Sequence, residues 1–252
     1  MPVPRRTRNA SSNVLQKAIS STLFATADDE LRPVMNGVYF DITEQDITFV
    51  ASDGHKLVRF RTNAAHGNNQ AAFILPKKPA GLLKNLLGKE DGDVTVAFND
   101  RNAVISVGDY QLICRLIEGK YPNYASVIPQ NNPFVLTLDR QSALSAVRRV
   151  SIFSSQASSL VKLSLSENKL TLSAQDIDFS TSAQEVVDCQ YVGTDMNIGF
   201  KATFLLDIFN NISSNEVTIA LADPSRAGVV EPAEQEEGES LLMLLMPMML
   251  ND

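Results

Sequence analysis

The run Asp53-Gly54-His55-Lys56 is the local motif with the most evident chemical potential. It follows the alternating apolar segment 47–51, and Asp-Gly is a typical turn sequence whose glycine suits a positive φ. An aspartate and a histidine could form an acid–base pair. However, the chain has only two histidines and no Gly-x-Ser-x-Gly motif to supply a nucleophile. We therefore expect no catalytic residues. The motif is either a tight turn with a hydrogen-bonded histidine or part of a binding surface, and an enzyme that uses His55 and Asp53 is the weaker alternative.

Residues for metal or cofactor chemistry are sparse. Cys114 and Cys189 cannot make a disulfide framework and indicate two reduced, buried thiols in a cytoplasmic protein. The chain has no Cys-x-x-Cys or His-x-x-x-His spacing and no glycine-rich phosphate-binding loop. The five glutamates within 231–239 are better explained as a solvated hairpin tip than as metal ligands. We expect neither a metal nor a cofactor.

The run Leu241 to Leu250 is entirely apolar apart from Pro247 and holds four of the seven methionines. With ten residues it is shorter than the roughly 20 that a membrane-spanning helix needs. One interpretation is a buried final strand. Pro247 cannot occupy a central strand, so we expect the chain to leave the sheet there and to expose methionines that could bind apolar side chains. The basic N-terminus has no apolar core and does not resemble a secretory signal.

The chain contains an internal repeat. The segment 93–100 (DVTVAFND) resembles 216–223 (EVTIALAD), and the two lie 123 residues apart. The same offset places Asp53 on Asp176, and the segment 82–87 on 205–210. Two copies of this length nearly fill the 252 residues. We therefore predict two domains, 1–129 and 130–252, with a linker at 1–10 and a boundary in the Pro/Asn-rich stretch 129–133.

Each copy shows two helical patterns and several alternating segments. Helical faces are expected within 13–27, from Pro79 to Gly88, after a capping Asp139, and at Leu205 to Ile212. Period-2 alternation is present at 47–50, 94–98, 104–107, 161–165, 170–173 and 217–221, and is typical of antiparallel sheet with one solvated face. The predicted fold class is α+β, with two tandem copies of one domain, each with two helices packed on antiparallel sheets.

Basic residues gather on the predicted helices, although the net charge is −7. Residues 76–89 carry four lysines and no acid, whereas 176–195 carry five acids and no base. Solvated helix faces commonly carry lysines, which is one explanation. The other is a positive surface that meets phosphates without reading bases, with weak, salt-dependent contacts to nucleic acid.

Five segments together resemble a known family. They are 31–38 (LRPVMNGV), 51–57 (ASDGHKL), 118–129 (EGKYPNYASVIP), 197–200 (NIGF) and 245–248 (LMPM). In order and spacing they are similar to the bacterial DNA sliding clamp, the beta subunit of DNA polymerase III. The resemblance covers the second and third of that family's three domains. It implies a non-catalytic processivity factor whose helices line a ring around duplex DNA, and a chain that, lacking the first domain, is a monomeric fragment.

The resemblance also implies a pocket between the two domains for short peptide motifs of polymerases, the clamp loader and repair proteins. Its apolar floor would be Met35, Leu57, Val127, Leu244, Met246 and Pro247. Its rim would be Arg32, Ser52, Gly54, His55, Lys56, Pro122, Phe204 and Met248. The side chains expected to face DNA are Lys17, Lys77, Lys78, Lys84, Arg140, Arg148, Arg149 and Lys201.

The sequence departs from the family pattern at several pocket positions. Phe204 replaces a common tyrosine, Val34 an aromatic residue and Met249 an arginine, and the chain continues to Asn251 and Asp252. We therefore expect a more apolar site with an altered ligand preference. An adaptor domain pair without a DNA role is the alternative function.

Overall fold

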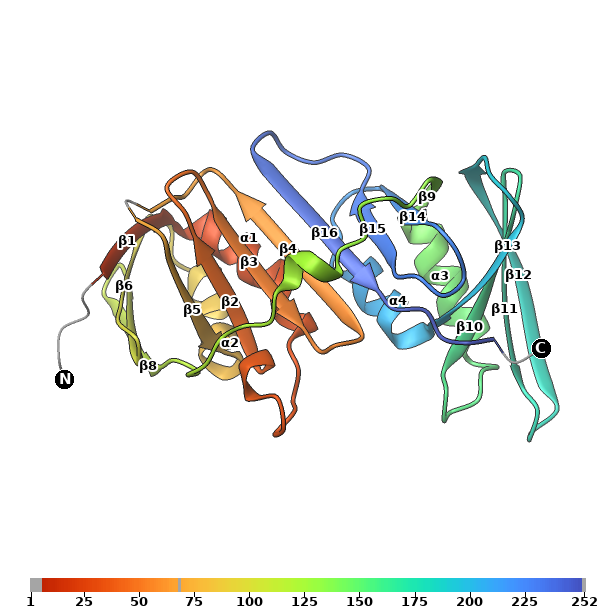
Figure 1. Ribbon diagram of the computed structural model, residues 1–252, viewed down its shortest axis with the longest axis horizontal. Helices are drawn as coiled ribbons and strands as arrows, with labels where there is room; N and C mark the ends of the chain where they lie inside the picture. Colours follow the sequence, from red (N-terminus) through yellow and green to blue (C-terminus); the bar gives the residue numbers. More distant parts are fainter. Residues whose placement is uncertain (1–5, 68, 251–252) are drawn as a thin grey trace. The chain divides into compact units, whose positions relative to one another are not determined.

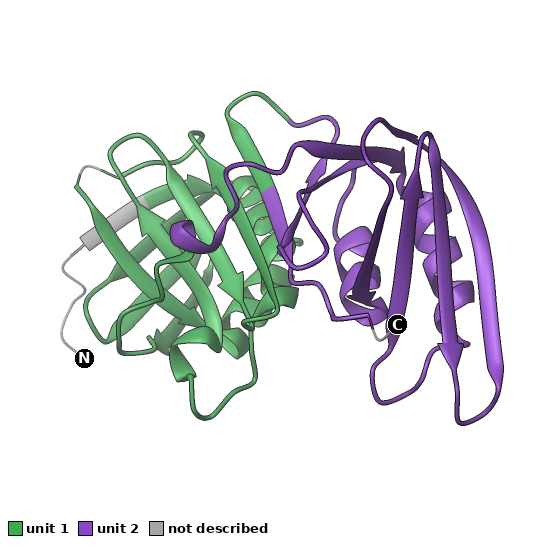
Figure 2. Cartoon of the chain, turned by 45° about the vertical axis from the view of Figure 1, so that its right-hand side comes forward, with its two compact units in different colours: residues 1–124, 236–241 green, residues 125–235, 242–252 purple. Residues whose placement is uncertain are grey.

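The computed structural model describes residues 6–67 and 69–250, which form two compact units (Figure 2). The first unit contains the described residues up to Tyr124 together with Glu236–Leu241. The second contains Ala125–Gln235 and the described residues from Leu242 onward. The division between Tyr124 and Ala125 lies five residues before the domain boundary predicted from the sequence. Asn251 and Asp252 lie outside the described residues, as does the first half of the predicted linker.

The first unit contains two α-helices and eight strands in its described part (Figure 1). In chain order they are β1 (Arg6–Ser11), α1 (Ser12–Thr22), β2 (Gly37–Ile42), β3 (Ile47–Ser52), β4 (Lys56–Thr62), β5 (Ala71–Pro76), α2 (Lys77–Leu87), β6 (Asp93–Phe98), β7 (Asn102–Val107) and β8 (Tyr110–Arg115). Short 3₁₀ turns lie at Leu23–Ala25 and Pro33–Met35, and a third, Tyr124–Val127, leads into the second unit. Residues 6–10, predicted as linker, belong to β1.

The second unit repeats this order. Its elements are β9 (Phe134–Asp139), α3 (Arg140–Ser151), β10 (Leu160–Ser166), β11 (Lys169–Asp176), β12 (Thr181–Tyr191), β13 (Met196–Lys201), α4 (Ala202–Asn210), β14 (Glu216–Leu221), β15 (Gly228–Pro232) and β16 (Glu239–Leu245). Both units therefore consist of a strand, a helix and three strands, repeated twice. The structure confirms the internal repeat and the α+β class, and it reveals a shorter repeat inside each unit.

The sheets are antiparallel and interleave the two halves of each unit. In the first unit the strand orders are β1-β6-β7-β8 and β4-β3-β2-β5. In the second they are β9-β14-β15-β16 and β12-β11-β10-β13, and the long β12 also pairs with β9. Because the first strand of each half joins the sheet of the other half by pairing with one of its strands, neither half can fold into a complete sheet alone.

The helices pack against these sheets through the apolar faces that the sequence predicts. Helix α1 contacts β1, β3 and β4, and α2 contacts β2, β5 and β8; the two helices also contact each other. In α1, Leu15, Ala18 and Ile19 are buried, and the Ser11 hydroxyl caps the helix by accepting from the Val14 N–H. Helix α3 begins as predicted at the cap Asp139, whose carboxylate accepts from the Ser142 N–H. No described helix is long and apolar enough to cross a membrane.

Several element predictions need correction. Helix α1 ends at Thr22 rather than 27, because the chain continues as a 3₁₀ turn. Helix α2 begins at Lys77, which places Pro79 within the first turn, where its missing N–H costs no intrahelical bond. Leu82, an apolar residue of the helical pattern predicted from Pro79 to Gly88, is exposed. The six alternating segments all lie in strands, whereas other strands, such as β4 and β13, were not predicted.

The segment Glu236–Leu241 belongs to the first unit although it comes late in the sequence. The Asn63 N–H donates to the Gly238 carbonyl at 3.0 Å, and the Arg59 guanidinium donates to the Ser240 hydroxyl at 3.1 Å. Lys17 forms ion pairs with Glu236 at 2.8 Å and with Glu239 at 2.5 Å. The prediction of a fully solvated hairpin is therefore wrong for Glu239, whose side chain is only 12% exposed.

Candidate functional site

The Asp53–Lys56 motif is a tight turn between β3 and β4. One carboxylate oxygen of Asp53, Oδ1, accepts from the N–H groups of His55 at 2.8 Å and Lys56 at 2.9 Å. The other, Oδ2, pairs with the Lys56 ammonium at 2.8 Å. Ser52 donates its hydroxyl to the Lys56 carbonyl and accepts from the Gly54 N–H. As the Asp-Gly pair predicts, Gly54 has a positive φ of 91°.

Asp53 is held in its charged form. Burial by itself would raise the pKa of this carboxyl group. The opposing effects are the ion pair with Lys56 and the two backbone donors, and they prevail, so that the pKa lies below its ordinary value. The Asp53 carboxylate therefore acts as a charged hydrogen-bond acceptor within its own turn. The enzyme alternative, which needs Asp53 to exchange a proton with His55, gains no support from this geometry.

Arg32 lies beside the turn. Its Nη2 donates to the Asp53 carbonyl at 3.2 Å, and its Nε donates to the Asp29 carboxylate at 2.7 Å. A Cβ atom on Gly54 would lie 2.6 Å from Arg32 Nη1, so the glycine also leaves room for this guanidinium. Asp29 precedes Arg32 by three residues, a spacing that could have indicated the pair, but the sequence reasoning did not include it.

The structure places most of the predicted peptide-binding residues of the first unit near this turn, but the exposure of some of them differs from the prediction. His55, Gly54 and Arg32 are exposed, as expected for a rim. Ser52 and Lys56, also predicted on the rim, are buried because both are hydrogen-bonded within the turn. The predicted floor residues Met35 and Leu57 are buried.

An aromatic cluster that the sequence analysis missed supports the loop that carries Pro122. Tyr121 is buried and stacks on Tyr39 with the ring centroids 4.7 Å apart, while the Tyr124 hydroxyl donates to Asp41 at 3.0 Å. Pro122 itself is exposed. The tyrosines lie far from Tyr39 in sequence, so no local pattern indicates the stack.

In the second unit, the methionine-rich segment leaves the sheet as Pro247 predicts. Strand β16 ends at Leu245, after which Met246 is 42% exposed. The Met248 N–H donates to the Gly199 carbonyl at 2.7 Å, which fixes the segment against β13. Leu244, a predicted floor residue, is buried within β16. Both interpretations of the run are therefore partly correct, because it is a buried strand followed by a partly exposed end.

The two remaining candidates of the second unit lie on other elements. Val127 closes a 3₁₀ turn and is 55% exposed. Phe204, in the first turn of α4, lies under the Lys201 ammonium, 5.2 Å from the ring centroid. Lys201, a predicted DNA-facing residue, therefore makes a cation–π contact within its own unit.

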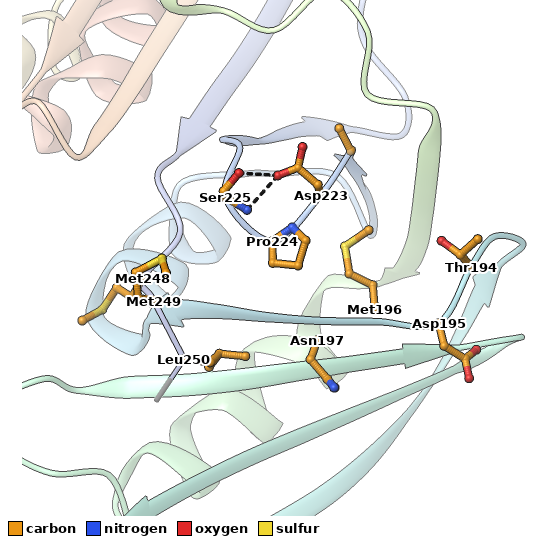
Figure 3. A pocket seen from close by; sticks show the side chains of 11 residues that line it. Thr194, Asp195, Met196, Asn197, Asp223, Pro224, Ser225, Met248, Met249 and Leu250 are labelled. Atoms are coloured by element: carbon orange, nitrogen blue, oxygen red, sulfur yellow. Dashed lines mark hydrogen bonds between the residues drawn. The ribbon is translucent and has the colours of Figure 1, made fainter. Parts of the chain in front are cut away.

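A cavity of about 610 Å³ adjoins Met248 in the second unit (Figure 3). Three segments line it: 194–197, 222–225 and 248–250. Of these residues, only Met248 was a predicted site residue. The cavity was not predictable from sequence, because its three walls are brought together only by the β13 and β14 ends and the docked C-terminal segment.

Seven of the predicted DNA-facing cations divide into three groups. Lys17, Lys77 and Arg149 form ion pairs with carboxylates of the chain, respectively Glu236 and Glu239, Asp28, and Glu185. Arg140 donates to the carbonyls of Phe209 and Ser214, and Arg148 donates to Asn210. For Lys78 and Lys84 no ion pair is present within the described residues.

The metal-ligating side chains and the cysteines can be placed among the described residues. Among them, no group of three or more His, Cys, Asp or Glu side chains is placed to hold a metal ion. Cys114 and Cys189 are both free and only half-buried, which corrects the expectation that they are buried thiols.

Comparison with known proteins gives two adjacent family matches. Residues 9–123 match the central domain of the DNA polymerase III beta subunit, and residues 125–248 match its C-terminal domain. Among curated proteins, the beta sliding clamp of Haemophilus influenzae is 29% identical over 231 residues, and that of Pseudomonas aeruginosa is 28% identical over 230. These matches cover 92% and 91% of the chain but only 63% and 62% of the relatives' lengths.

Solved structures agree. A sliding clamp from Bartonella birtlesii bound to griselimycin is 30% identical with a TM-score of 0.92, covering 98% of this chain and 67% of that one. A griselimycin-bound clamp from Pseudomonas aeruginosa gives a TM-score of 0.93 at 27% identity, covering 98% of this chain and 66% of that one. With two family domains matched in tandem over nearly all of its residues, the chain belongs to the DNA polymerase III beta subunit family, the bacterial sliding clamps.

Proposed function

We propose that the chain serves as part of a sliding clamp, a non-catalytic processivity factor that tethers a DNA polymerase to duplex DNA. The observation that carries this proposal is the tandem match of the two units to the central and C-terminal clamp domains. Because the chain spans about 63% of its curated relatives' length, a closed homodimeric ring belongs to a protein of that full length. We expect such a protein to act in the cytoplasm.

We further propose that residues of both units bind short linear motifs of polymerases, the clamp loader and repair proteins. The first unit offers a rigid turn with exposed backbone at Gly54 and a fixed guanidinium at Arg32. The second unit offers the exposed side chain of Met246, two residues before Met248, whose backbone pairs with Gly199 of β13. An apolar surface with a few fixed polar groups suits a peptide whose leucine and aromatic anchors supply most of the binding energy. The two solved relatives bound to griselimycin show that clamps of this family take a ligand.

The peptide proposal is tested by a single substitution at Met246, an exposed apolar residue of the methionine-rich segment. Met246→Asp places a charge where an apolar anchor would bind, at a cost of about 1.5 to 3 kcal/mol. We expect a labelled Gln-x-x-Leu-Phe-like peptide to bind at least about tenfold more weakly in fluorescence polarisation.

The matched control is Val186→Asp. Val186 lies on β12, is 51% exposed and belongs to no predicted site. This variant should bind the peptide as the unsubstituted chain does. Equal affinity of the Met246→Asp variant and the unsubstituted chain would refute the assignment of the methionine-rich segment to peptide binding.

A second candidate function is an adaptor domain pair without a DNA role. The observation in its favour is that Lys17, Lys77 and Arg149 are already paired with carboxylates of the chain. An adaptor would bind the same peptide but would not require the remaining cations, which the charge-reversal experiment described in the Discussion tests.

A further inference from the structure

The 610 Å³ cavity of the second unit is lined by both apolar and acidic side chains, and its two aspartates lie on different segments (Figure 3). Met196, Met248, Met249 and Leu250 contribute the apolar atoms, and Pro224 adds to them. Asp195 and Asp223 contribute carboxylates from two different turns. No lysine or arginine lines the cavity. The combination is typical of a site for a cation that carries apolar surface.

The apolar side is fixed by the backbone. Gly199 on β13 faces the segment 248–250, and a Cβ atom there would lie 2.8 Å from both the Met248 carbonyl oxygen and Leu250 Cδ2. Together with the hydrogen bond from the Met248 N–H to the Gly199 carbonyl, this close approach holds the segment on the strand. Met249, which follows Met248, is 80% exposed and is free to contact a ligand.

The two carboxylates are not equivalent. Asp223 accepts from the Ser225 hydroxyl at 2.5 Å and N–H at 2.9 Å, and its other oxygen lies 3.3 Å from Arg226 Nε, so part of its charge is already compensated. Asp195 is exposed, and no ion pair to it is present within the described residues. Its turn is held by the Tyr191 hydroxyl, which donates to the Thr194 carbonyl at 2.7 Å. Asp195 is therefore the carboxylate available to a ligand.

We propose that this cavity binds an arginine or lysine side chain flanked by an apolar residue, in a partner segment adjoining the short motif held by the proposed peptide site. The inference rests on the proposed function, since Met248 belongs to both surfaces. The basic head would lie against Asp195, and the aliphatic stem would lie along the methionines. Two features favour a protein segment over a free small cation. Met248 belongs to both the cavity and the proposed peptide site, and the methionine side chains offer apolar contacts that a small cation would not make.

The experiment uses the chain with ¹³C-labelled methionine methyl groups and two probe peptides. Acetyl-Leu-Arg-Leu amide is compared with acetyl-Leu-citrulline-Leu amide, which has nearly the same shape but no charge. We expect the arginine peptide to shift the methyl signals of Met196, Met248 and Met249, and to bind at least about threefold more tightly than the citrulline peptide.

Two variants outside the proposed peptide site locate the interaction. Asp195→Asn should lower the affinity for the arginine peptide to that for the citrulline peptide, and Met249→Lys should abolish binding by placing a cation in the cavity. The matched control is Asp188→Asn, which removes an equal charge from exposed β12 and should change nothing. Equal affinity for both peptides, no shift at these methionines, or an unaffected Asp195→Asn variant overturns the inference.

A parallel titration with the Gln-x-x-Leu-Phe-like peptide separates this inference from the proposed function. If the motif peptide shifts Met246 and the arginine peptide shifts nothing, the inference fails and the proposed function stands. If only the arginine peptide binds, the ligand class of the cavity stands and the proposed peptide function fails. If both bind, the motif peptide is extended by arginine or by citrulline, first at its N-terminus and then at its C-terminus. At one of the two ends the arginine peptide should bind more tightly than the citrulline peptide. If the two peptides have equal affinity at both ends, the cavity does not adjoin the motif.

Discussion

At the residue scale, the turn at Asp53–Lys56 shows how four consecutive residues can build a tightly hydrogen-bonded turn. The Asp53 carboxylate binds two backbone N–H groups and one ammonium, and Gly54 adopts a φ that other residues avoid. The same residues could have been read as catalytic. What distinguishes the two interpretations is that the hydrogen bonds of the Asp53 carboxylate come from His55 and Lys56 within the turn.

Glycine is required at position 54 by backbone conformation more than by space. We expect Gly54→Ala to destabilise the fold by about 1 to 2 kcal/mol, because alanine is strained at a φ of 91°. Gly81→Ala is the opposite case. The position lies inside α2, and an added Cβ atom would have Leu23 Cδ2 as its nearest neighbour, at 3.9 Å. We expect this substitution to increase the free energy of unfolding by about 0.5 to 1 kcal/mol. Urea unfolding measures both changes, and a stabilising Gly54→Ala would contradict the strain argument.

The lowered pKa of Asp53 predicts a pH-dependent contribution to stability. A carboxyl group whose pKa is lower in the folded state stabilises the fold above its unfolded pKa of about 3.9. That stabilisation is lost as the pH falls through the lower folded pKa. Asp53→Asn should therefore cost about 1 to 2 kcal/mol near pH 7. The difference from the unsubstituted chain should shrink as the pH falls below about 4.

Urea unfolding across this pH range measures the difference for Asp53→Asn. The control is Asp91→Asn, an exposed position where we expect a change within about 0.5 kcal/mol at every pH. A difference for Asp53→Asn that stays constant down to the acid limit would show that the charged form is not what stabilises the turn.

At the element scale, the segment Glu236–Leu241 is tied to α1 by charge. Lys17 contacts two glutamates that lie more than 200 residues away in sequence, and one of them, Glu239, is mostly buried. A basic helix and an acidic hairpin, which the sequence shows as separate features, are partners in the fold. The consequence is that Lys17 contributes less positive charge to any DNA-facing surface than its place on α1 suggests.

The ion pair between Lys17 and Glu239 can be measured by a double-mutant cycle with Lys17→Met and Glu239→Gln. Because Lys17 is 38% exposed, solvent screens the pair, and we expect a coupling energy of about 0.5 to 1 kcal/mol that falls in about 1 M salt. The pair of Lys77 and Asp28 serves as the control: both side chains are more exposed, and its coupling should be near zero. Equal coupling energies in the two cycles would show that burial of Glu239 has no influence.

At the scale of the whole molecule, the two units have identical topology, and seven of the 22 lysines and arginines lie on their helices: Lys17, Lys77, Lys78, Lys84, Arg140, Arg148 and Arg149. A clamp that encircles DNA needs only weak, sequence-independent contacts, because topology rather than affinity prevents its loss. The proposed DNA contacts therefore depend on side chains that are not already neutralised. Lys78 and Lys84 on α2 meet this condition within the described residues, whereas Lys77 and Arg149 are paired with carboxylates.

Charge reversal separates these two groups in a protein of the relatives' full length that contains this sequence. Lys78→Glu with Lys84→Glu should weaken DNA association and reduce the slope of log affinity against log salt by about 2. Lys77→Glu with Arg149→Glu is the control and should change the slope less, because each cation is already partly neutralised. If neither pair affects DNA association, the adaptor function is favoured over the clamp.

The sequence alone determined the features that depend on local order. The repeat at an offset of 123 residues, the capping Asp139, the turn at Gly54 and the departure of the chain at Pro247 all follow from residue types and spacing. Period-2 alternation identified six strands, of which β3 is buried along its whole length. Strand β4 was not predicted, although its residues from Val58 to Thr62 alternate between buried and more exposed side chains.

Only the tertiary structure decided the partners that lie far apart in the chain. The interleaved sheets, the pairing of Lys17 with Glu239, the stack of Tyr39 on Tyr121 and the cavity beside Met248 join segments that no local pattern connects. The physical reason is that hydrophobic periodicity records which face of an element is buried, but not which other element buries it. The ion pairs of a side chain and the residues that line a cavity both depend on which elements pack together.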